Sequence, residues 1–198
     1  MISLLVATHN RHKTGELADL LGDQFQVRDL SESPAPPINE TGNTFAENAI
    51  LKAVTTSRDQ PGLLVIADDS GLEVDSLGGA PGVFSARYAG VNAIDQANIQ
   101  KLLRELRGAR NRTARFQAVI ALARDGGVLG TFPGTVEGLI VDPPRGREGF
   151  GYDPVFLPNG FDQTFGEMAP RLKNQISHRA KAVAALSDFL QRAGRREN

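Results

Sequence analysis

The sequence predicts an α/β fold with a mixed β-sheet, and two observations carry this prediction. In the first half of the chain, short apolar runs alternate with segments of helical periodicity, the pattern of strand–helix–strand units. Residues 113–141 then form two long apolar stretches that turn near Gly126-Gly127, as a hairpin does. Buried strands are also expected over residues 2–8 and 62–68, which are short, apolar and rich in branched side chains.

Helices are indicated where apolar side chains recur at three- and four-residue intervals. The first places Leu17, Leu20 and Leu21 on one face, with Gly22 as a plausible stop. The later helices begin near polar residues that can accept hydrogen bonds from backbone N–H groups. Helices are expected over residues 10–22, 43–59, 92–106 with Asn92 as cap, and 177–193 with Ser177 as cap.

The intervening segments are rich in Gly, Pro and Ser and predict loops. The chain contains no internal repeat and no low-complexity linker, so one domain is expected over residues 1–198. Irregular structure is expected over residues 31–42, 78–90 and 143–156, and a frayed tail over 194–198.

Composition excludes several classes of function. The formal net charge is -1, so there is no basic field to hold long nucleic acid. The absence of cysteine excludes disulfides, thiol nucleophiles and zinc–thiolate sites. The first residues do not resemble a signal peptide, and no apolar stretch is long enough to span a membrane. We therefore expect a cytoplasmic protein.

The segment THNRHKT, residues 8–14, lies between a predicted strand and a predicted helix. A helix amino terminus presents unpaired N–H groups that suit phosphate, and Lys13 adds a full charge. The glycines that let a P-loop wrap phosphates are missing, so a P-loop is disfavoured. The alternative is an ordinary capped helix with exposed basic residues.

The segment ADDSG, residues 67–71, follows a strongly apolar run and contains adjacent acids. Side chains alternate along a strand, so Asp68 and Asp69 should point to opposite sides. One should enter a cleft, where it could bind Mg²⁺ or orient a water, and the other should brace the segment. Glu40 matters only if the metal needs a second carboxylate. A surface turn and a solvated Glu40 are the alternatives.

Two later segments could contact a nucleotide. In EGFGYDP, residues 148–154, the glycines allow close backbone approach, and Phe150 or Tyr152 could stack on a base. In KNQISHR, residues 173–179, a loop lysine and a basic helix start could donate to phosphate or carbonyl oxygen. Aromatics that plug the core and a capped basic helix are the alternatives.

Several long motifs in order resemble one family, the inosine/xanthosine triphosphate pyrophosphatases or Ham1-like enzymes. The motifs are VATHNRHKTGEL, ETGNTFAENAILKA, IADDSGLEVDSLGGAPGVFSARYAG, ARFQAVIAL, GFGYDPVF and KNQISHRAKA. The resemblance covers about residues 2–190. It implies a long central mixed sheet with two α/β lobes flanking a substrate cleft, and a homodimer. It also implies Mg²⁺-dependent hydrolysis of ITP, dITP or XTP to the monophosphate and pyrophosphate.

The resemblance also implies roles for the matching residues. Asp69 is implied as the catalytic base and, with Glu40, as a metal ligand. Substrate-binding roles are implied for Thr8, His9, Asn10, Arg11, His12, Lys13, Ser70, Phe150, Gly151, Tyr152, Asp153, Lys173, His178 and Arg179. Thr8 to Lys13 would bind the triphosphate, Phe150 to Asp153 the base and sugar, and Lys173, His178 and Arg179 would grip the base and substrate.

One departure from the family pattern lies in the first loop. Many members carry a pattern like T-G-N-x-G-K there, and this chain has His9 and His12 at the glycine positions while keeping Asn10 and Lys13. Two rival functions stay open at the level of sequence. One is a Maf-like pyrophosphatase acting on dTTP or UTP, and the other is a nucleotide-binding sensor that does not hydrolyse.

Overall fold

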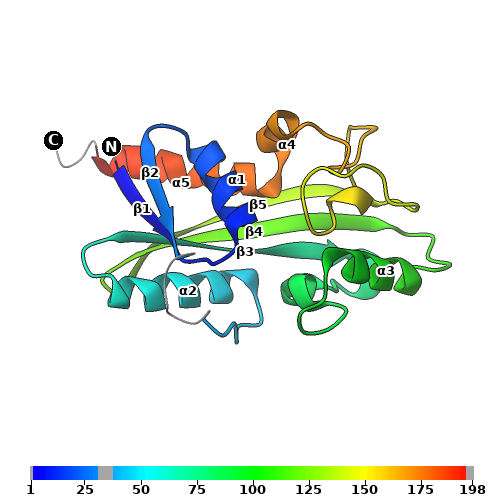
Figure 1. The fold of residues 1–198 in the computed structure, drawn as a ribbon, viewed down its shortest axis with the longest axis horizontal. Coiled ribbons are helices and arrows are strands. Elements are labelled where there is room, and N and C mark those ends of the chain that lie inside the picture. Colours follow the sequence, from blue (N-terminus) through cyan, green and yellow to red (C-terminus); the bar gives the residue numbers. More distant parts are fainter. Residues whose placement is uncertain (1, 31–37, 195–198) are drawn as a thin grey trace. The chain divides into compact units, whose positions relative to one another are not determined.

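The computed structural model describes residues 2–30 and 38–194 and has the predicted mixed α/β architecture. One six-stranded sheet has the order β2-β1-β3-β4-β5-β6 (Figure 1). Strand β1 pairs in parallel with β2 and β3, whereas β5 pairs antiparallel with β6. The strands are β1 Ile2–Val6, β2 Phe25–Asp29, β3 Leu64–Val74, β4 Thr113–Arg124, β5 Gly127–Ile140 and β6 Phe156–Pro158.

The helices follow the predicted periodicity in four places and add one that was not predicted. The α-helices are α1 Arg11–Leu21, α2 Phe45–Asp59, α3 Asp95–Glu105, α4 Pro170–Ile176 and α5 His178–Gly194. Two short 3₁₀ turns, η2 Gly82–Arg87 and η3 Asp153–Val155, lie within segments predicted to be irregular, and a third, η1 Asp75–Leu77, directly follows β3. Apart from Gly194, which ends α5, the expected tail over 194–198 lies outside the described residues, as does most of the Pro- and Ser-rich loop over 31–42.

Four details of the sequence prediction were wrong. Strand β3 does not end at Asp68, because Leu72 and Val74 are fully buried and continue the strand past the acids. Helix α3 is preceded by Ile94, and Asn92, with φ of 63°, does not cap it. Strand β2 and helix α4 were missed, since five- and seven-residue elements show too little periodicity.

The chain forms two compact units, each with its own core. The first unit comprises residues 1–69, 118–134 and 179–198, and the second comprises 70–117 and 135–178. Strands β3, β4 and β5 contribute residues to both. The expectation that the lobes are not independent domains stays a prediction.

The core of the first unit is built from β1, β3, β4 and the helices α1 and α5. Leu17 and Leu21 of α1 and Leu186 of α5 pack with Ile66 and Ile120 of the sheet. Figure 1 shows α1 and α5 on one face of these strands and α2 on the other. Helix α2 begins at a Thr44 cap, whose hydroxyl accepts from the Glu47 N–H at 3.1 Å. This packing holds the amino-terminal part of β3, up to Asp69, between helices.

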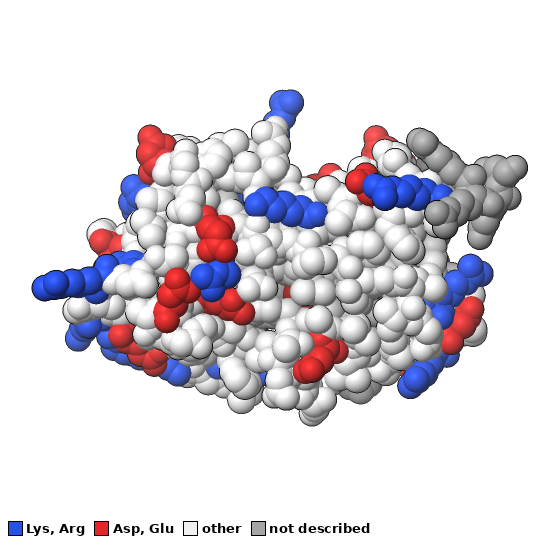
Figure 2. Space-filling view, turned by 180° about the vertical axis from the view of Figure 1, so that it is seen from behind, with Lys and Arg blue, Asp and Glu red and all other residues white. Residues whose placement is uncertain are grey.

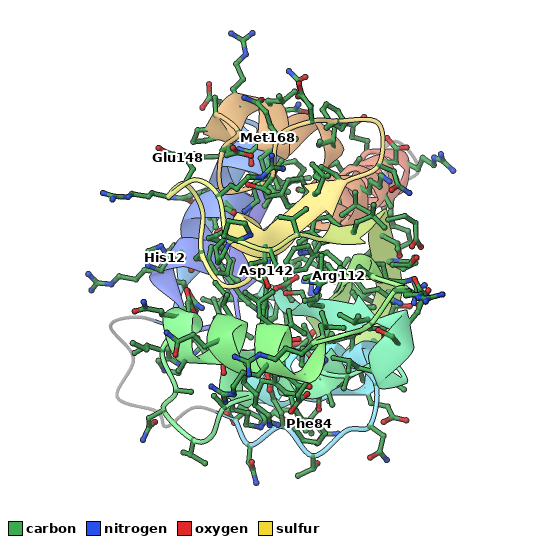
Figure 3. The ribbon with its side chains drawn as sticks, turned by 90° about the vertical axis from the view of Figure 1, so that its right-hand side faces the viewer. His12, Phe84, Arg112, Asp142, Glu148 and Met168 are labelled. Atoms are coloured by element: carbon green, nitrogen blue, oxygen red, sulfur yellow. The ribbon has the colours of Figure 1, made fainter. Side chains whose placement is uncertain are left out.

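The core of the second unit is aromatic. Phe116 contacts Phe156 edge to face, with ring centroids 4.7 Å apart, and stacks on Phe165 at 6.0 Å. Leu102 and Leu106 of the α3 region are fully buried against the same cluster. In contrast, Phe84 of η2, labelled in Figure 3, is 57% exposed.

The turn between β4 and β5 is fixed by hydrogen bonds to the end of α2 and to the loop between α2 and β3. Asp125 and Gly126 adopt positive φ angles of 50° and 79°. The Gly62 N–H donates to Asp125 Oδ1 at 2.7 Å, and the Gly126 N–H donates to Ser57 Oγ at 3.0 Å. The turn near Gly126-Gly127 is therefore confirmed, and tertiary hydrogen bonds hold it.

Truncating a leucine should cost stability according to its burial. Leu122 is fully buried in the first core, whereas Leu129 of β5 is 45% exposed. We expect Leu122→Ala to lower the free energy of unfolding by about 2–5 kcal/mol. Leu129→Ala should change it by less than about 1 kcal/mol. Urea denaturation of both variants measures the difference, and equal losses would contradict the assignment of Leu122 to the core.

Candidate functional site

The predicted site residues divide between the two units. Thr8 to Lys13, Glu40, Asp69 and Arg179 belong to the first unit, whereas Ser70, Phe150 to Asp153, Lys173 and His178 belong to the second. The boundaries fall between Asp69 and Ser70 and between His178 and Arg179. Each half is therefore described by itself.

Asp68 and Asp69 face different partners, as the alternation along β3 predicts. Asp68 Oδ2 lies 2.9 Å from Lys13 Nζ and 3.2 Å from Arg179 Nη2. Asp69 Oδ1 lies 3.2 Å from Lys52 Nζ, and Asp69 Oδ2 accepts from Asn48 Nδ2 at 3.2 Å. The bracing acid, Asp68, is thus held by side-chain cations.

Opposite forces act on the pKa values of these neighbouring acids. Burial tends to raise the pKa of Asp68, but Arg179 and Lys13 outweigh it and hold the pKa far below its ordinary value. Burial raises the pKa of Asp69 above its ordinary value, and Lys52 only partly offsets this. Asp68 is therefore a permanent charge, while Asp69 binds a proton more readily.

Lys52 of α2 is a functional candidate that the sequence analysis missed. Its ammonium lies 2.7 Å from Glu40 Oε1 and 3.2 Å from Asp69 Oδ1, and it donates to the Asp68 carbonyl at 2.9 Å. Burial alone would lower the pKa of Lys52, but Asp69 and Glu40 raise it, so the group stays charged. The available signal was a lysine within the apolar face of a helix.

Asn48 was also missed, and it connects the two predicted metal ligands. Its Oδ1 accepts from the Gly42 N–H at 2.8 Å, in the loop that carries Glu40. Its Nδ2 donates to Asp69 at 3.2 Å. A Cβ at Gly42 would lie 2.7 Å from Asn48 Oδ1, so glycine is needed for this approach.

The predicted phosphate loop starts α1, and Asn10 caps it. Asn10 Oδ1 accepts from the N–H groups of His12 at 3.0 Å and Lys13 at 3.3 Å. The Asn10 N–H donates to Thr8 Oγ1 at 3.1 Å. Arg11 and His12 are exposed, His9 is half-exposed, and His12 is labelled in Figure 3. Lys13 of this loop forms an ion pair with one of the β3 acids, Asp68.

Arg179 is the second residue of α5 and is almost completely buried. Its guanidinium forms ion pairs with Glu16 of α1 and Asp68 of β3. These carboxylates raise the pKa of Arg179 although burial opposes the charge. In this structure Arg179 therefore links α1, β3 and α5, and its expected contact with substrate stays a prediction.

The cluster in the first unit is acidic overall. Glu16, Glu40, Asp68 and Asp69 are paired with Lys13, Lys52 and Arg179, so four carboxylates face three cations. Glu40 and Asp69 both contact one ammonium, which shows that their oxygens converge on one position suited to a cation. Within residues 2–30 and 38–194, no group of three or more acidic or histidine side chains is arranged as a metal site.

The predicted base-binding segment is fixed by Asp153. Asp153 Oδ2 accepts from the Phe150 N–H at 2.9 Å and from Lys173 Nζ at 2.7 Å. The same ammonium lies 5.2 Å from the centre of the Phe150 ring. Lys173 was expected in a loop, but it lies on α4 and is buried. Phe150, Asp153 and Lys173 are thus brought together.

Other contacts complete this half. Asp95 at the start of α3 accepts from the Gly151 N–H at 2.7 Å, and Tyr152 donates to the Ser85 carbonyl at 2.9 Å. The His178 ring stacks on Phe116 with centroids 4.8 Å apart and is 4% exposed. Ser70 lies in β3 directly after Asp69 and is half-buried. Asp95 was not predicted, because nothing local marks an exposed helix-start acid as a loop partner.

Charge on the molecular surface is mixed. Figure 2 shows acidic and basic side chains scattered over the face in view, without a continuous field of one sign. Among the described residues, no helix combines the length and apolar character needed to cross a bilayer.

Comparison with known proteins identifies close relatives over nearly the whole chain. The model of the Ham1 family matches residues 4–189. A dITP/XTP pyrophosphatase of Bacillus licheniformis is 48% identical, with 98% of this chain and 100% of that protein covered. One from Geobacillus kaustophilus is 50% identical, with coverages of 95% and 94%. The solved HAM1 protein of Coxiella burnetii has a TM-score of 0.86 and 44% identity, with coverages of 97% and 100%.

Removing the Asp68 carboxylate should strongly destabilise the protein. Asp68→Asn leaves the buried Arg179 and Lys13 charges without this partner, which should cost about 3–5 kcal/mol of unfolding free energy. Asp75→Asn is the matched control, because Asp75 pairs with Arg115 at 2.7 Å near the surface. That change should cost about 0–1 kcal/mol. Chemical denaturation compares them, and similar losses would contradict a special role for Asp68.

Proposed function

Because the chain belongs to the Ham1 family, we propose that it hydrolyses non-standard purine nucleoside triphosphates, ITP, dITP and XTP, to the monophosphate and pyrophosphate. The shared name of its relatives supports the substrate class. The observation that carries the chemistry is the convergence of Glu40 and Asp69 on one cation position. The proposal makes the protein an enzyme that cleanses the nucleotide pool.

We propose Glu40 and Asp69 as the residues that hold Mg²⁺. Mg²⁺ commonly uses one or two carboxylates, with waters and substrate phosphates completing its octahedron. The two carboxylates of Glu40 and Asp69, which converge on one position, match this coordination preference. When bound, the ion would offset phosphate charge and lower the pKa of a nearby water.

Asp69 is the proposed proton acceptor. Because pyrophosphate leaves, water should attack the α-phosphorus, and a carboxylate with a raised pKa accepts the proton of water more readily. Asn48 holds Asp69 Oδ2 and so restricts the orientation of the carboxylate. Lys13 would neutralise charge on the leaving pyrophosphate. Asp68 Oδ2 forms ion pairs with both Lys13 and Arg179, so Asp68 suits the role of support.

Stacking on the base is assigned to a residue of the second unit. Phe150 would stack on the purine, in a position set by Asp153 and Lys173. A donor from His178 or Arg179 would pair with the 6-oxo group. Opposite the 6-amino group of adenine, the same donor would stay unpaired at a cost of about 1–3 kcal/mol. This difference would favour ITP and XTP over ATP.

We also propose that the protein works in the cytoplasm as a homodimer. Support for the dimer comes from large apolar side chains exposed in one segment of the second unit. Phe84, Val91 and Ile94 are 57%, 84% and 67% exposed, and exposed apolar groups in proximity are typical of interfaces. The Tyr88–Glu105 hydrogen bond holds this segment to α3.

A substrate panel tests the proposed function. Pyrophosphate release with Mg²⁺ should be strong for ITP, dITP and XTP and roughly 5- to 150-fold weaker for ATP, because the unpaired donor costs about 1–3 kcal/mol. Release is measured in parallel for GTP, dTTP and UTP. Preference for dTTP or UTP would favour a Maf-like enzyme, and no release from any nucleotide would favour a sensor.

Replacing Asp69 tests its chemical role. Asp69→Asn keeps the shape and removes the proton acceptor, so kcat for ITP should fall by about 10²–10⁴-fold, the usual contribution of a general base. Nucleotide affinity, measured by calorimetry, should change much less. Asp75→Asn again serves as the control and should keep kcat. Near-wild-type kcat in Asp69→Asn would exclude this residue as the base.

A further inference from the structure

Lys52 has the contacts expected of a cation that belongs to the site itself. Its ammonium has three N–H donors, and three acceptors lie around it. These are Glu40 Oε1 at 2.7 Å, Asp69 Oδ1 at 3.2 Å and the Asp68 carbonyl oxygen at 2.9 Å. The Lys52 side chain is only 11% exposed. The ammonium thus fills the position on which Glu40 and Asp69 converge.

Helix α2 holds this arrangement rigidly. Asn48 lies one turn before Lys52 and faces the same strand. Asn48 binds Asp69 Oδ2, while Lys52 binds Asp69 Oδ1, so donors from one helix hold both carboxylate oxygens. Asn48 also holds the Gly42 N–H in the loop of Glu40. The position of the ammonium is therefore set by the fold of the first unit.

A metal ion held by Glu40 and Asp69 would approach carboxylates that already contact Lys52, through Glu40 Oε1 and Asp69 Oδ1. Two cations competing for the same oxygens in a partly buried site repel each other more strongly than they would in water. The ammonium and the metal ion are therefore alternatives at this position. The negative charge of a triphosphate would offset the extra positive charge when both cations must stay nearby.

We propose that Lys52 is a resident counter-cation that keeps the free protein from binding Mg²⁺ tightly, and that it yields its place when metal and nucleotide arrive together. This inference rests on the proposed function for the identity of the metal and the nucleotide. It adds a specific role for Lys52: it prevents repulsion between Glu40 and Asp69 in the free protein and makes metal binding depend on substrate.

Metal binding without nucleotide tests this proposal directly. Mn²⁺ is the probe, since its electron paramagnetic resonance signal reports the unbound ion. Lys52→Met removes the ammonium and keeps a long apolar side chain. We expect this variant to bind Mn²⁺ about tenfold or more tightly than wild type, because a neighbouring opposite charge shifts the proton affinity of a carboxylate by 1–3 pKa units. Lys52→Gln, which keeps an N–H donor, is the second variant if the first does not fold.

Lys13→Met is the matched control. It removes the same charge from the first unit. Lys13 forms its ion pair with Asp68, however, whereas Lys52 forms ion pairs with Glu40 and Asp69. Its gain in Mn²⁺ affinity should be clearly smaller. The double variant Lys52→Met/Glu40→Gln should lose the gain, because one bridging carboxylate is gone. Circular dichroism and thermal melting check that each variant is folded.

The outcomes separate this inference from the proposed function. Equal Mn²⁺ affinity in wild type and folded Lys52 variants would overturn it, and so would equal gains in the Lys13 and Lys52 variants. If wild type hydrolyses ITP while Lys52→Met shows no gain, the proposed function stands and the exchange fails. If Lys52→Met gains affinity and no nucleotide is hydrolysed, the cation exchange stands and the proposed function fails.

Discussion

The candidate site depends on accommodating two adjacent carboxylates inside the protein. Burying an ionised acid is costly unless a cation or several hydrogen bonds compensate it. Asp68 and Asp69 are 3% and 6% exposed, so each needs its own partners. Because β3 turns them to opposite sides, cations reach them from different helices: Lys13 from α1, Arg179 from α5 and Lys52 from α2. Segments far apart in the sequence are thereby held to one strand.

The need to compensate both buried carboxylates also gives Asp68 and Asp69 different pKa values. Two cations contact Asp68 Oδ2 and keep its pKa low, so it stays ionised and stabilises the fold. Asp69 shares Lys52 with Glu40, and its pKa is raised. Pairs of acids whose environments separate their pKa values commonly divide support and proton transfer between them. The partners of both acids therefore support the proposal that Asp69, and not Asp68, acts as the base.

The sequence predicts this architecture well where periodicity is long. The hairpin of β4 and β5, helix α1 with its stop at Gly22, and helix α2 were all confirmed. The path of β3 was harder, because an acidic pair usually marks the end of a buried strand. It continues here only because three distant cations neutralise the acids, and no local pattern announces them. Lys52 lies within the predicted helix over residues 43–59, yet its partners became visible only in three dimensions.

The GFGYD segment shows a second limit of local interpretation. Its glycines suggest close approach to a ligand, but Gly149 also has an internal reason. A Cβ there would lie 1.9 Å from Asp153 Oδ2, the oxygen that accepts from Phe150 N–H and Lys173. Glycine therefore lets a carboxylate approach the backbone, and that carboxylate fixes the aromatic ring expected to stack on a base. The contacts within this motif therefore fix the position of the Phe150 ring before any substrate binds. Such fixing matters because an aromatic ring selects a base by stacking only if its position is set beforehand.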